Sequence, residues 1–284
     1  MSVTIFKSPS KMQSFVDSLR ARGKIIGLVP TMGAIHEGHL RLVDIAAKKS
    51  DYIIASIFVN PTQFGPKEDL SKYPRTFKSD CEKLEKAGVK AVFHPSVSDM
   101  YPDNYSTIVD VGEITTILEG ARRPVHFRGV ATVCAKLFNI TKPHIAVFGQ
   151  KDGQQLAVIK RMVRDLNFDL TIIKGPIVRT PAGIALSSRH SYLSPKGLEK
   201  AKIIRGALKL SEKLVKGGIR NSKTIEARMH GMIKSVAGTK VDYIAINRWD
   251  DLEPIKKLSG RVMISLVVVI EKVRLLDNMI INVK

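Results

Sequence analysis

The sequence predicts an α/β protein with a doubly wound parallel sheet and a smaller C-terminal α+β domain. Over roughly the first 180 residues, short apolar runs alternate with amphipathic segments, which is the order of strands and helices in a parallel sheet. Beyond that point, two basic helical segments are followed by two further apolar runs. The length of 284 residues is ample for two domains, which we place at residues 1–178 and 179–284. The larger domain is therefore expected to be Rossmann-like.

The predicted strands are the apolar runs. Residues 24–29 (KIIGLV) end at Pro30, and residues 52–59 (YIIASIFV) are almost continuously β-branched or aromatic, as a strand buried on both faces should be. The other predicted strands of the larger domain are KAVFHP at 90–95, STIVDV at 106–111, HIAVFG at 144–149 and LTIIKGPIV at 170–178.

The predicted helices lie between these runs. HLRLVDIAAKK follows the first strand, and SDCEKLEKAG is a helix closed by Gly88. GVATVCAKLFNI and GQQLAVIKRMVRDLN precede and follow the strand at 144–149. In the smaller domain, PKGLEKAKIIRGALKLSEKLVKGG carries apolar residues at helical spacing, and VDYIAI and RVMISLVVVI are the predicted strands.

The composition is that of an ordinary globular protein, with 44% hydrophobic and 25% charged residues. No apolar run approaches the roughly 20 residues that cross a bilayer, and the first residues lack the apolar core of a secretory signal. Cys81 and Cys134 are far apart and show no metal-binding or redox spacing. We therefore expect a cytoplasmic protein with reduced thiols and no membrane partner.

The net charge of +20 raises the question of nucleic-acid binding. Residues 1–176 contribute 25 − 17 = +8, and the remaining 108 residues contribute 21 − 9 = +12. In that C-terminal part the lysines alternate with apolar residues of predicted helices, and no aromatic residues stand among them to stack bases. Solvated helix faces are therefore favoured over a nucleic-acid surface, and a positive field would attract small anionic substrates.

The stretch PTMGAIHEGH at residues 30–39 leaves a strand and enters a helix, where open α/β sheets bind ligands. Its helix N-terminus suits phosphate, and Gly33 and Gly38 would let the backbone approach a ligand. If the helix begins near Ile35, His36 and His39 lie one turn apart on the same face and can donate hydrogen bonds to phosphate oxygens. One histidine would indicate an ordinary turn, whereas the HxGH pattern favours nucleotide chemistry.

This HxGH turn resembles the motif of the nucleotidylyltransferase superfamily. Further segments narrow the resemblance, namely SIFVNPTQFGPKEDLSKYPRT, RRPVHFRGVATVCAKLFN, VFGQKDGQQL and ALSSRHSYLS. Together they are similar to the pantothenate synthetase (pantoate–β-alanine ligase) family along essentially the whole chain. The resemblance implies an ATP-dependent ligase that joins (R)-pantoate to β-alanine through pantoyl adenylate, releases AMP and pyrophosphate, requires Mg²⁺ and supplies coenzyme A synthesis.

The resemblance also implies a set of site residues. The catalytic residues would be His39, as proton donor, with His36, Lys151 and Arg189. Positions that match the family's ATP-binding residues are Met32, Gly33, Ala34, Ile35, His36, Glu37, Gly38, His39, Gly149, Gln150, Lys151, Asp152, Val178, Leu186, Ser187, Ser188 and Arg189. Positions that match residues binding pantoate or β-alanine are Gln63, Gln155 and Asn60. Metal ligands are not identified.

These residue types suit the implied chemistry. A neutral amide such as that of Gln63 both donates and accepts, as the hydroxyls and carboxylate of pantoate require. Lys151 supplies a cation for phosphates, and Asp152 could contact ribose or a metal. Serine hydroxyls and the guanidinium of Arg189 can hold a triphosphate, on a loop that closes over ATP. Arg123 and His126 are further candidate anion contacts.

Five positions depart from the family pattern. Gln150 and Gly153 stand where glutamate and an aromatic residue are frequent, and Gly153 is expected to loosen the start of the next helix. His190 replaces a common asparagine, and Glu271 and Lys272 stand where small residues are expected.

Two alternative functions remain open at this point. One is another HxGH enzyme that transfers the nucleotide and keeps it in its product. The other is a basic nucleic-acid-binding protein. For the ligase, the family resemblance implies a homodimer, small-molecule substrates and a C-terminal domain that closes over the active site.

Overall fold

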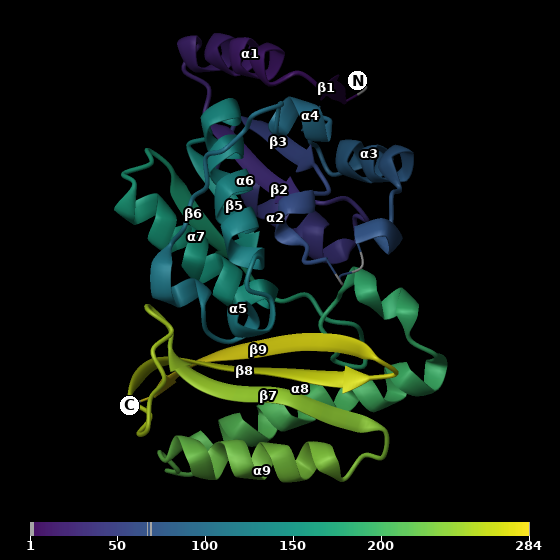
Figure 1. The fold of residues 1–284 in the computed structure, drawn as a ribbon, viewed down its shortest axis with the longest axis vertical. Coiled ribbons are helices and arrows are strands. Elements are labelled where there is room, and N and C mark those ends of the chain that lie inside the picture. Colours follow the sequence, from purple (N-terminus) through teal and green to yellow (C-terminus); the bar gives the residue numbers. More distant parts are fainter. Residues whose placement is uncertain (1–2, 67, 69, 284) are drawn as a thin grey trace. The chain divides into compact units, whose positions relative to one another are not determined.

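The computed structural model describes residues 3–66, 68 and 70–283 (Figure 1). The chain forms two compact units. The first consists of Met1–Gly149 and Val158–Pro176, and the second consists of Gln150–Ala157 and Ile177–Lys284. The segment from Gln150 to Ala157 thus belongs to the second unit although it interrupts the first in sequence. The roles predicted for residues 1–178 and 179–284 stay predictions.

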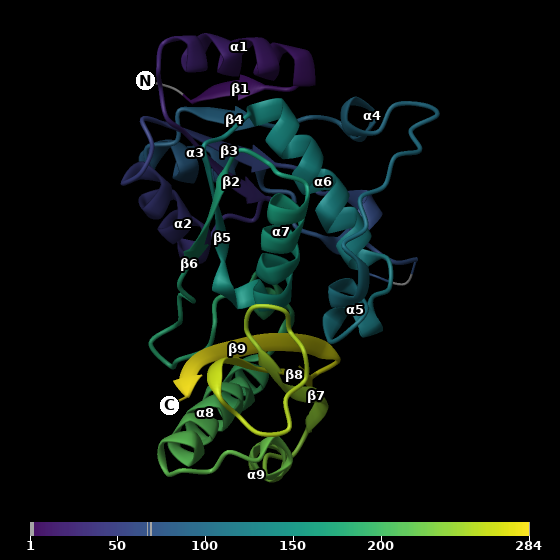
Figure 2. The same cartoon turned by 90° about the vertical axis from the view of Figure 1, so that its left-hand side faces the viewer.

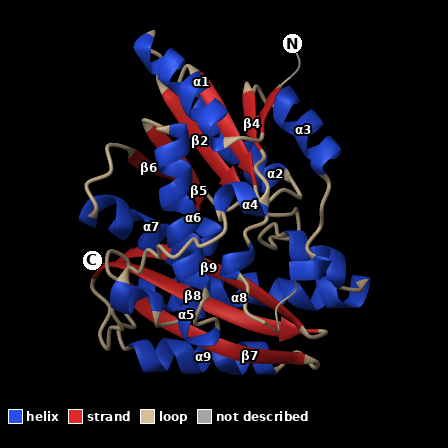
Figure 3. Ribbon diagram, turned by 45° about the horizontal axis from the view of Figure 1, so that its top comes forward, coloured by secondary structure: helices blue, strands red, loops and turns tan. Residues whose placement is uncertain are grey.

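The first unit is built on a six-stranded sheet in the order β1-β4-β3-β2-β5-β6, in which every neighbouring pair is parallel. Its strands are among those drawn in red in Figure 3. Its strands are β1 (Thr4–Phe6), β2 (Ile26–Thr31), β3 (Tyr52–Ile57), β4 (Ala91–Phe93), β5 (Ile145–Gly149) and β6 (Thr171–Gly175). The predicted parallel α/β fold is therefore confirmed. The strand order reverses between β2 and β5, which is the point where such sheets bind ligands.

Helices cover both faces of this sheet (Figure 2). On one face α2 (Glu37–Ala47) and α3 (Phe77–Lys86) pack against the central strands. On the other, α6 (His126–Thr141) contacts β2, and α1 (Pro9–Ala21) contacts α6. Successive side chains of a strand point to opposite faces, and both are buried here, so the strands read as continuous apolar runs.

The second unit contains a three-stranded antiparallel sheet in the order β7-β8-β9. Its strands are β7 (Thr239–Arg248), β8 (Gly260–Ile270) and β9 (Val273–Val283). Two long helices, α8 (Pro195–Lys216) and α9 (Ser222–Lys234), pack on one side of the sheet and share its apolar core (Figure 1). The predicted smaller α+β domain is confirmed.

Shorter elements and α7 complete the described structure. α7 (Gly153–Asp165) follows β5. The remaining helices are η1 (Pro61–Gln63), η2 (Leu70–Lys72), α4 (Val97–Met100), η3 (Gly112–Thr115), α5 (Glu119–Arg122), η4 (Gln150–Asp152) and η5 (Ser188–Tyr192). Within the described part of the chain, no helix combines the length and apolar character needed to cross a membrane.

Three details of the predicted secondary structure are wrong. Residues 106–111, all of which are described, form no strand: Ile108 is 64% exposed, and the Val109 N–H donates to Thr132 Oγ1 rather than to a neighbouring strand. Pro30 does not end its strand but lies inside β2, paired with Ser56. The C-terminal sheet has β9 as a third strand, which its polar residues conceal in the sequence.

Candidate active site

The HxGH turn joins β2 to α2 in the first unit. Gly33 and Ala34 both have positive φ values, of 83° and 51°, so the backbone turns sharply before the helix. The helix begins at Glu37, with His36 as its N-cap, which is two residues later than predicted from the sequence. The difference arises because the His36 side chain takes the capping role that Ser, Thr or Asp usually fills.

The two histidines form a reciprocal cap. His36 Nδ1 accepts a hydrogen bond from the Gly38 N–H (3.1 Å), and His39 Nδ1 accepts from the His36 N–H (3.3 Å). The ring centroids are 4.1 Å apart. Because each Nδ1 accepts, the neutral rings carry their hydrogen on Nε2. Each imidazole therefore combines a structural acceptor with a donor on its opposite side, as phosphate binding requires.

The structure gives a second reason for glycine at position 38, besides the predicted approach of a ligand. A Cβ added at this position would lie 2.7 Å from His36 Cε1, closer than such atoms approach in proteins. Glycine therefore leaves room for the His36 ring to fold back onto the helix terminus. The HxGH spacing is in this way a requirement of the cap itself.

Helix α3 contributes two residues that the sequence analysis missed. The Asp80 carboxylate, 1% exposed, accepts hydrogen bonds from the N–H groups of Ala34 (2.9 Å) and Ile35 (2.8 Å). Lys83 Nζ donates to the Ile35 carbonyl (2.8 Å). Opposite charges on one helix thus hold the turn before the histidines. The signal was present in the sequence, since Asp80 is four residues from Leu84 and shares its apolar face.

Gln63 ends the short helix η1 and is 7% exposed. Its Oε1 accepts from Asn60 Nδ2 (3.2 Å), and its Nε2 donates to Met32 Sδ (3.0 Å), which brings a predicted pantoate residue beside the predicted ATP-binding turn. Asn60 also donates to the Gly129 carbonyl (3.1 Å) and accepts from the Tyr101 hydroxyl (2.8 Å). Its polar atoms are therefore engaged within the protein, and Asn60 orients Gln63.

Burial raises the pKa of Tyr101 to about 12, so its hydroxyl stays protonated and donates to Asn60. Lys136 Nζ lies 4.6 Å from the centroid of the neighbouring Tyr105 ring, and burial lowers the pKa of this lysine. The Tyr101 hydroxyl thus supports Asn60, which is 1% exposed and in turn bonds to Gln63.

Arg123 and His126, the further candidate anion contacts, are largely committed to contacts within the protein. Arg123 holds Glu68 with two hydrogen bonds, of 2.9 and 2.5 Å. Burial raises the pKa of Glu68, but the hydrogen bonds and charge of Arg123 outweigh it and leave that pKa below its usual value. His126 Nδ1 donates to the Gln63 carbonyl (3.0 Å), so this cluster also supports the Gln63 turn.

In the second unit, η4 carries Lys151, whose side chain is 22% exposed, and Asp152, whose side chain is 51% exposed. Lys151 Nζ lies 3.5 Å from Asp152 Oδ1. Gln155 follows in the first turn of α7 and is half-buried. The cation, the carboxylate and the amide predicted to meet the substrates thus project from one helical start.

The loop with the other predicted ATP-binding residues belongs to the same unit. The Leu186 N–H donates to the Val178 carbonyl (2.9 Å), and Ser187 Oγ accepts from the Arg189 N–H (3.3 Å) as the N-cap of η5. Burial lowers the pKa of His190, and the charge of Lys151 lowers it further. His190, one of the departures from the family pattern, thus feels the charge of Lys151.

The predicted site residues lie in two groups, one in each unit. The first contains the turn from Met32 to His39 with Gln63, and the second contains Lys151 and the loop up to Arg189. Among the described residues, no group of three or more His, Cys, Asp and Glu side chains could hold a metal ion.

Three of these five departures, Gly153, Glu271 and Lys272, have a physical explanation. A Cβ on Gly153 would lie 2.7 Å from Met263 Sδ and 3.2 Å from Asn278 Nδ2, so glycine lets the start of α7 approach the sheet. Glu271 and Lys272, with φ values of 51° and 68°, form the tight turn from β8 to β9. Hydrogen bonds from Ser194 lower the pKa of Glu271 and tie this turn to the N-cap of α8.

The chain is similar in sequence to known proteins over nearly its whole length. The profile of the Pantoate-beta-alanine ligase family matches residues 4–280. A pantothenate synthetase from Caldicellulosiruptor saccharolyticus is 50% identical over 273 residues, covering 96% of this chain and 97% of that protein. Another from Moorella thermoacetica is 48% identical over 279 residues, covering 98% and 99%.

Solved structures give the same relationship. The crystal structure of pantothenate synthetase from Thermus thermophilus has a TM-score of 0.92 and 38% sequence identity, covering 98% of this chain and 99% of that one. The pantoate-beta-alanine ligase from Francisella tularensis, solved with β,γ-ATP and β-alanine, has a TM-score of 0.81 and 36% identity, covering 98% and 97%.

Proposed function

This chain belongs to the pantoate–β-alanine ligase family, and from that premise we propose that it joins pantoate to β-alanine, with ATP cleaved to AMP and pyrophosphate. The observation that carries the proposal is the family match over residues 4–280, which includes the HxGH turn and both predicted groups of ATP-binding residues. The product, pantothenate, is a precursor of coenzyme A.

In the first half-reaction the pantoate carboxylate attacks the α-phosphorus of ATP, and pyrophosphate leaves. Both reactants are anions, so the main tasks are to place them in line and to neutralise charge. We assign these tasks to the Nε2 donors of His36 and His39 and to the cations Lys151 and Arg189. The tautomers set by the cap support this assignment, because they direct hydrogen-bond donors away from the helix.

Mg²⁺ is proposed as the companion of ATP. The ion usually keeps several waters and binds through one or two carboxylates and the substrate phosphates. The single, half-exposed carboxylate of Asp152 beside Lys151 fits this pattern. Bound in this way, Mg²⁺ would offset negative charge on the phosphates.

Pantoate is proposed to bind through Gln63 and Gln155, with Asn60 acting on Gln63. Both polar atoms of the Gln63 amide are hydrogen-bonded, Oε1 to Asn60 and Nε2 to Met32. The side chain is therefore already ordered, and little of its conformational entropy is lost when a ligand binds. In the second half-reaction the β-alanine amine attacks the acyl carbon of pantoyl adenylate, and AMP leaves. The loop from Leu186 to Arg189 is proposed to shield that anhydride from water.

Pyrophosphate release with each substrate omitted in turn tests the proposal. ATP and pantoate alone should release about one pyrophosphate per active site, whereas AMP should appear only after β-alanine is added. A strict requirement of β-alanine for the first turnover would overturn the two-step scheme.

Analysis of the nucleotide product separates the first alternative, and a binding test separates the second. An HxGH enzyme that keeps the nucleotide would yield an adenylylated product instead of free AMP. A nucleic-acid-binding protein would retain a random oligonucleotide with an affinity that falls steeply with salt. We also propose that the enzyme is a cytoplasmic homodimer, as the resemblance implies, and light scattering on the purified protein would determine its mass.

A further inference from the structure

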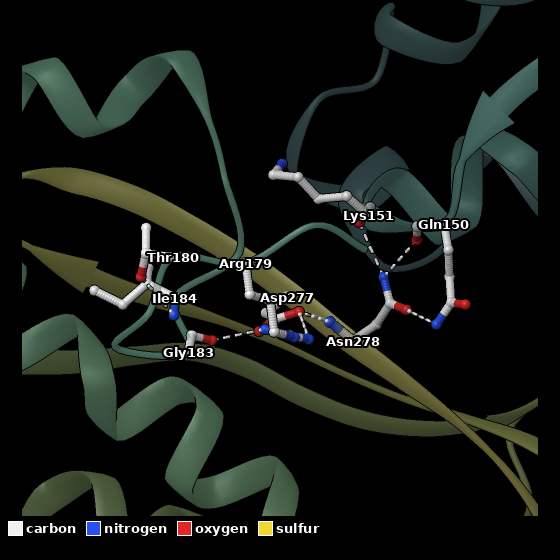
Figure 4. A network of polar contacts seen from close by, with 8 residues as sticks. All are labelled: Gln150, Lys151, Arg179, Thr180, Gly183, Ile184, Asp277 and Asn278. Carbon is white, nitrogen blue, oxygen red and sulfur yellow. Dashed lines mark hydrogen bonds and ion pairs between the residues drawn. The ribbon is translucent and has the colours of Figure 1, made fainter. Parts of the chain in front are cut away.

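Strand β9 carries two adjacent buried polar residues that the proposed chemistry does not use. Asp277 is 2% exposed and Asn278 is 1% exposed. Buried polar side chains are costly unless they are hydrogen-bonded. Their side chains bond to two segments distant in sequence, at residues 150–151 and at Arg179, all within the second unit (Figure 4).

Asn278 uses its whole amide on η4. Nδ2 donates to the carbonyls of Gln150 (2.9 Å) and Lys151 (2.9 Å), and Oδ1 accepts from Gln150 Nε2 (3.2 Å). Both amide hydrogens are thereby used on consecutive carbonyls, which fixes the backbone from which the Lys151 side chain departs.

Asp277 holds the other segment. Arg179 donates to its carboxylate through Nη1 (2.6 Å) and Nη2 (2.9 Å), and the Asn278 N–H donates to Oδ1 (2.8 Å). Arg179 Nη1 also donates to the Gly183 carbonyl (3.1 Å). Arg179 directly follows Val178 in the sequence. Its guanidinium therefore holds the turn at residues 179–183, which leads to Leu186.

We propose that Asp277 and Asn278 are positioning residues that hold two ATP-binding segments, around residues 150–152 and 178–186, at a fixed spacing. Consecutive residues of a strand are separated by only about 3.3 Å along its axis, so two anchors on one strand allow little relative movement. The close approach of Gly153 to Asn278 supports this role, since a larger residue would force the two apart. The inference rests on the proposed function, because ATP binding by these segments is part of that proposal.

Asn278→Asp tests the inference with almost no change in shape. The variant replaces the two amide donors with a carboxylate that faces two carbonyl oxygens. We expect the KM for ATP to rise by at least about tenfold, from the loss of two buried hydrogen bonds, with the KM for pantoate within about twofold of wild type. Asn282→Asp is the matched control, because it makes the same charge change at an exposed position of the same strand.

A second variant tests the same role in case Asn278→Asp does not fold. Arg179→Met/Asp277→Leu removes both charges of the buried pair together, which proteins tolerate better than the loss of one partner. It should also raise the KM for ATP selectively, with a melting temperature near that of wild type. Equal increases in both KM values, an unchanged KM for ATP, or failure of both variants to fold would overturn the positioning role.

Measurements on the wild-type protein distinguish a failure of the proposed function from a failure of the positioning role. If wild type bound ATP in a calorimetric titration but released no pyrophosphate with pantoate, the proposed function would fall, whereas weaker ATP binding by Asn278→Asp would still support the positioning role. If wild type released pyrophosphate and Asn278→Asp kept its KM for ATP, the inference alone would fall.

Discussion

We propose that His39 performs two tasks with atoms on opposite sides of one ring. Nδ1 accepts from the His36 N–H and completes the helix cap, while Nε2 is the donor assigned to the reacting phosphate. His39→Ala removes both, and we expect adenylation to fall by about 10²–10³-fold, as for the loss of one transition-state donor. Single-turnover pyrophosphate release would measure this step.

The informative control is His39→Asn, whose Oδ1 can take the place of Nδ1. This variant should retain the cap and a near wild-type melting temperature, yet lose as much adenylation rate as His39→Ala. Full adenylation by the asparagine variant would reduce His39 to a capping residue.

Among residues outside the HxGH turn, we expect Asp80 to contribute most to the stability of the turn. In Asp80→Asn one carboxylate oxygen becomes an NH₂ group, which then faces the N–H of Ala34 or Ile35. Losing one bond to a charged acceptor and leaving a buried N–H unpaired should cost about 2–4 kcal/mol in the free energy of unfolding.

Urea unfolding of Asp80→Asn beside Glu82→Gln would check this expectation. Glu82 is exposed on the same helix, so its variant makes the same charge change without touching the turn. Equal stability losses in the two variants would mean that the helix charge, rather than the contact with the turn, is responsible.

The sequence predicted the residues that we assign to this site but not the contacts that support them. His36, His39, Gln63 and Lys151 could be named because their residue types and spacing match a family pattern. The position of Asp80 on the apolar face of α3 is visible in the sequence, but its partners and those of Asn278 are not, because both side chains bond to backbone groups of segments far away in sequence. The Nδ1 cap was likewise hidden, since it depends on ring orientation.

At the scale of elements, α6 and η1 meet at a glycine. A Cβ on Gly129 would lie 2.5 Å from the Gln63 nitrogen and 2.5 Å from the Thr62 carbonyl oxygen. These are backbone atoms and cannot move aside as a flexible side chain would. Gly129→Ala should therefore displace the Gln63 turn, lower the free energy of unfolding by about 1–3 kcal/mol and weaken pantoate binding.

Gly231→Ala provides the comparison, because Gly231 lies inside α9 with nothing within 4 Å of an added Cβ. There the alanine should stabilise the protein by up to about 1 kcal/mol through helix propensity alone. Denaturant unfolding and a pantoate titration of both variants would suffice. A stabilised Gly129→Ala variant with normal pantoate binding would contradict the close packing.

Element prediction succeeded where periodicity and burial agree. The apolar run of β3 is buried on both faces and was predicted as such. Residues 106–111 have the same β-branched character but lie exposed along α6, because tertiary contacts rather than propensity decide strand pairing. β9 escaped prediction for the opposite reason, since Asp277 and Asn278 interrupt its apolar pattern with polar residues that are buried.

At the scale of the whole molecule, the net charge of +20 should govern the response to salt. Many of the described ion pairs join exposed partners, as in Lys216–Glu212 and Arg164–Asp165, and such pairs stabilise a protein little. Repulsion among the excess cations therefore outweighs their attraction to the carboxylates. The C-terminal 108 residues, with a net +12, should contribute most of this repulsion.

Raising sodium chloride from about 10 to 200 mM shortens the Debye length from about 30 Å to below 10 Å and should screen this repulsion. We expect stability to increase by about 1 kcal/mol, equivalent to about 2–4 °C in melting temperature. Chloride is preferable to sulfate, because a polyvalent anion could also bind where phosphates do. The increase should be smaller in Lys209→Gln/Lys213→Gln, which removes two exposed cations of α8. A melting temperature that falls with salt would show instead that attraction between surface charges dominates, and the basic excess would then need a binding partner to explain it.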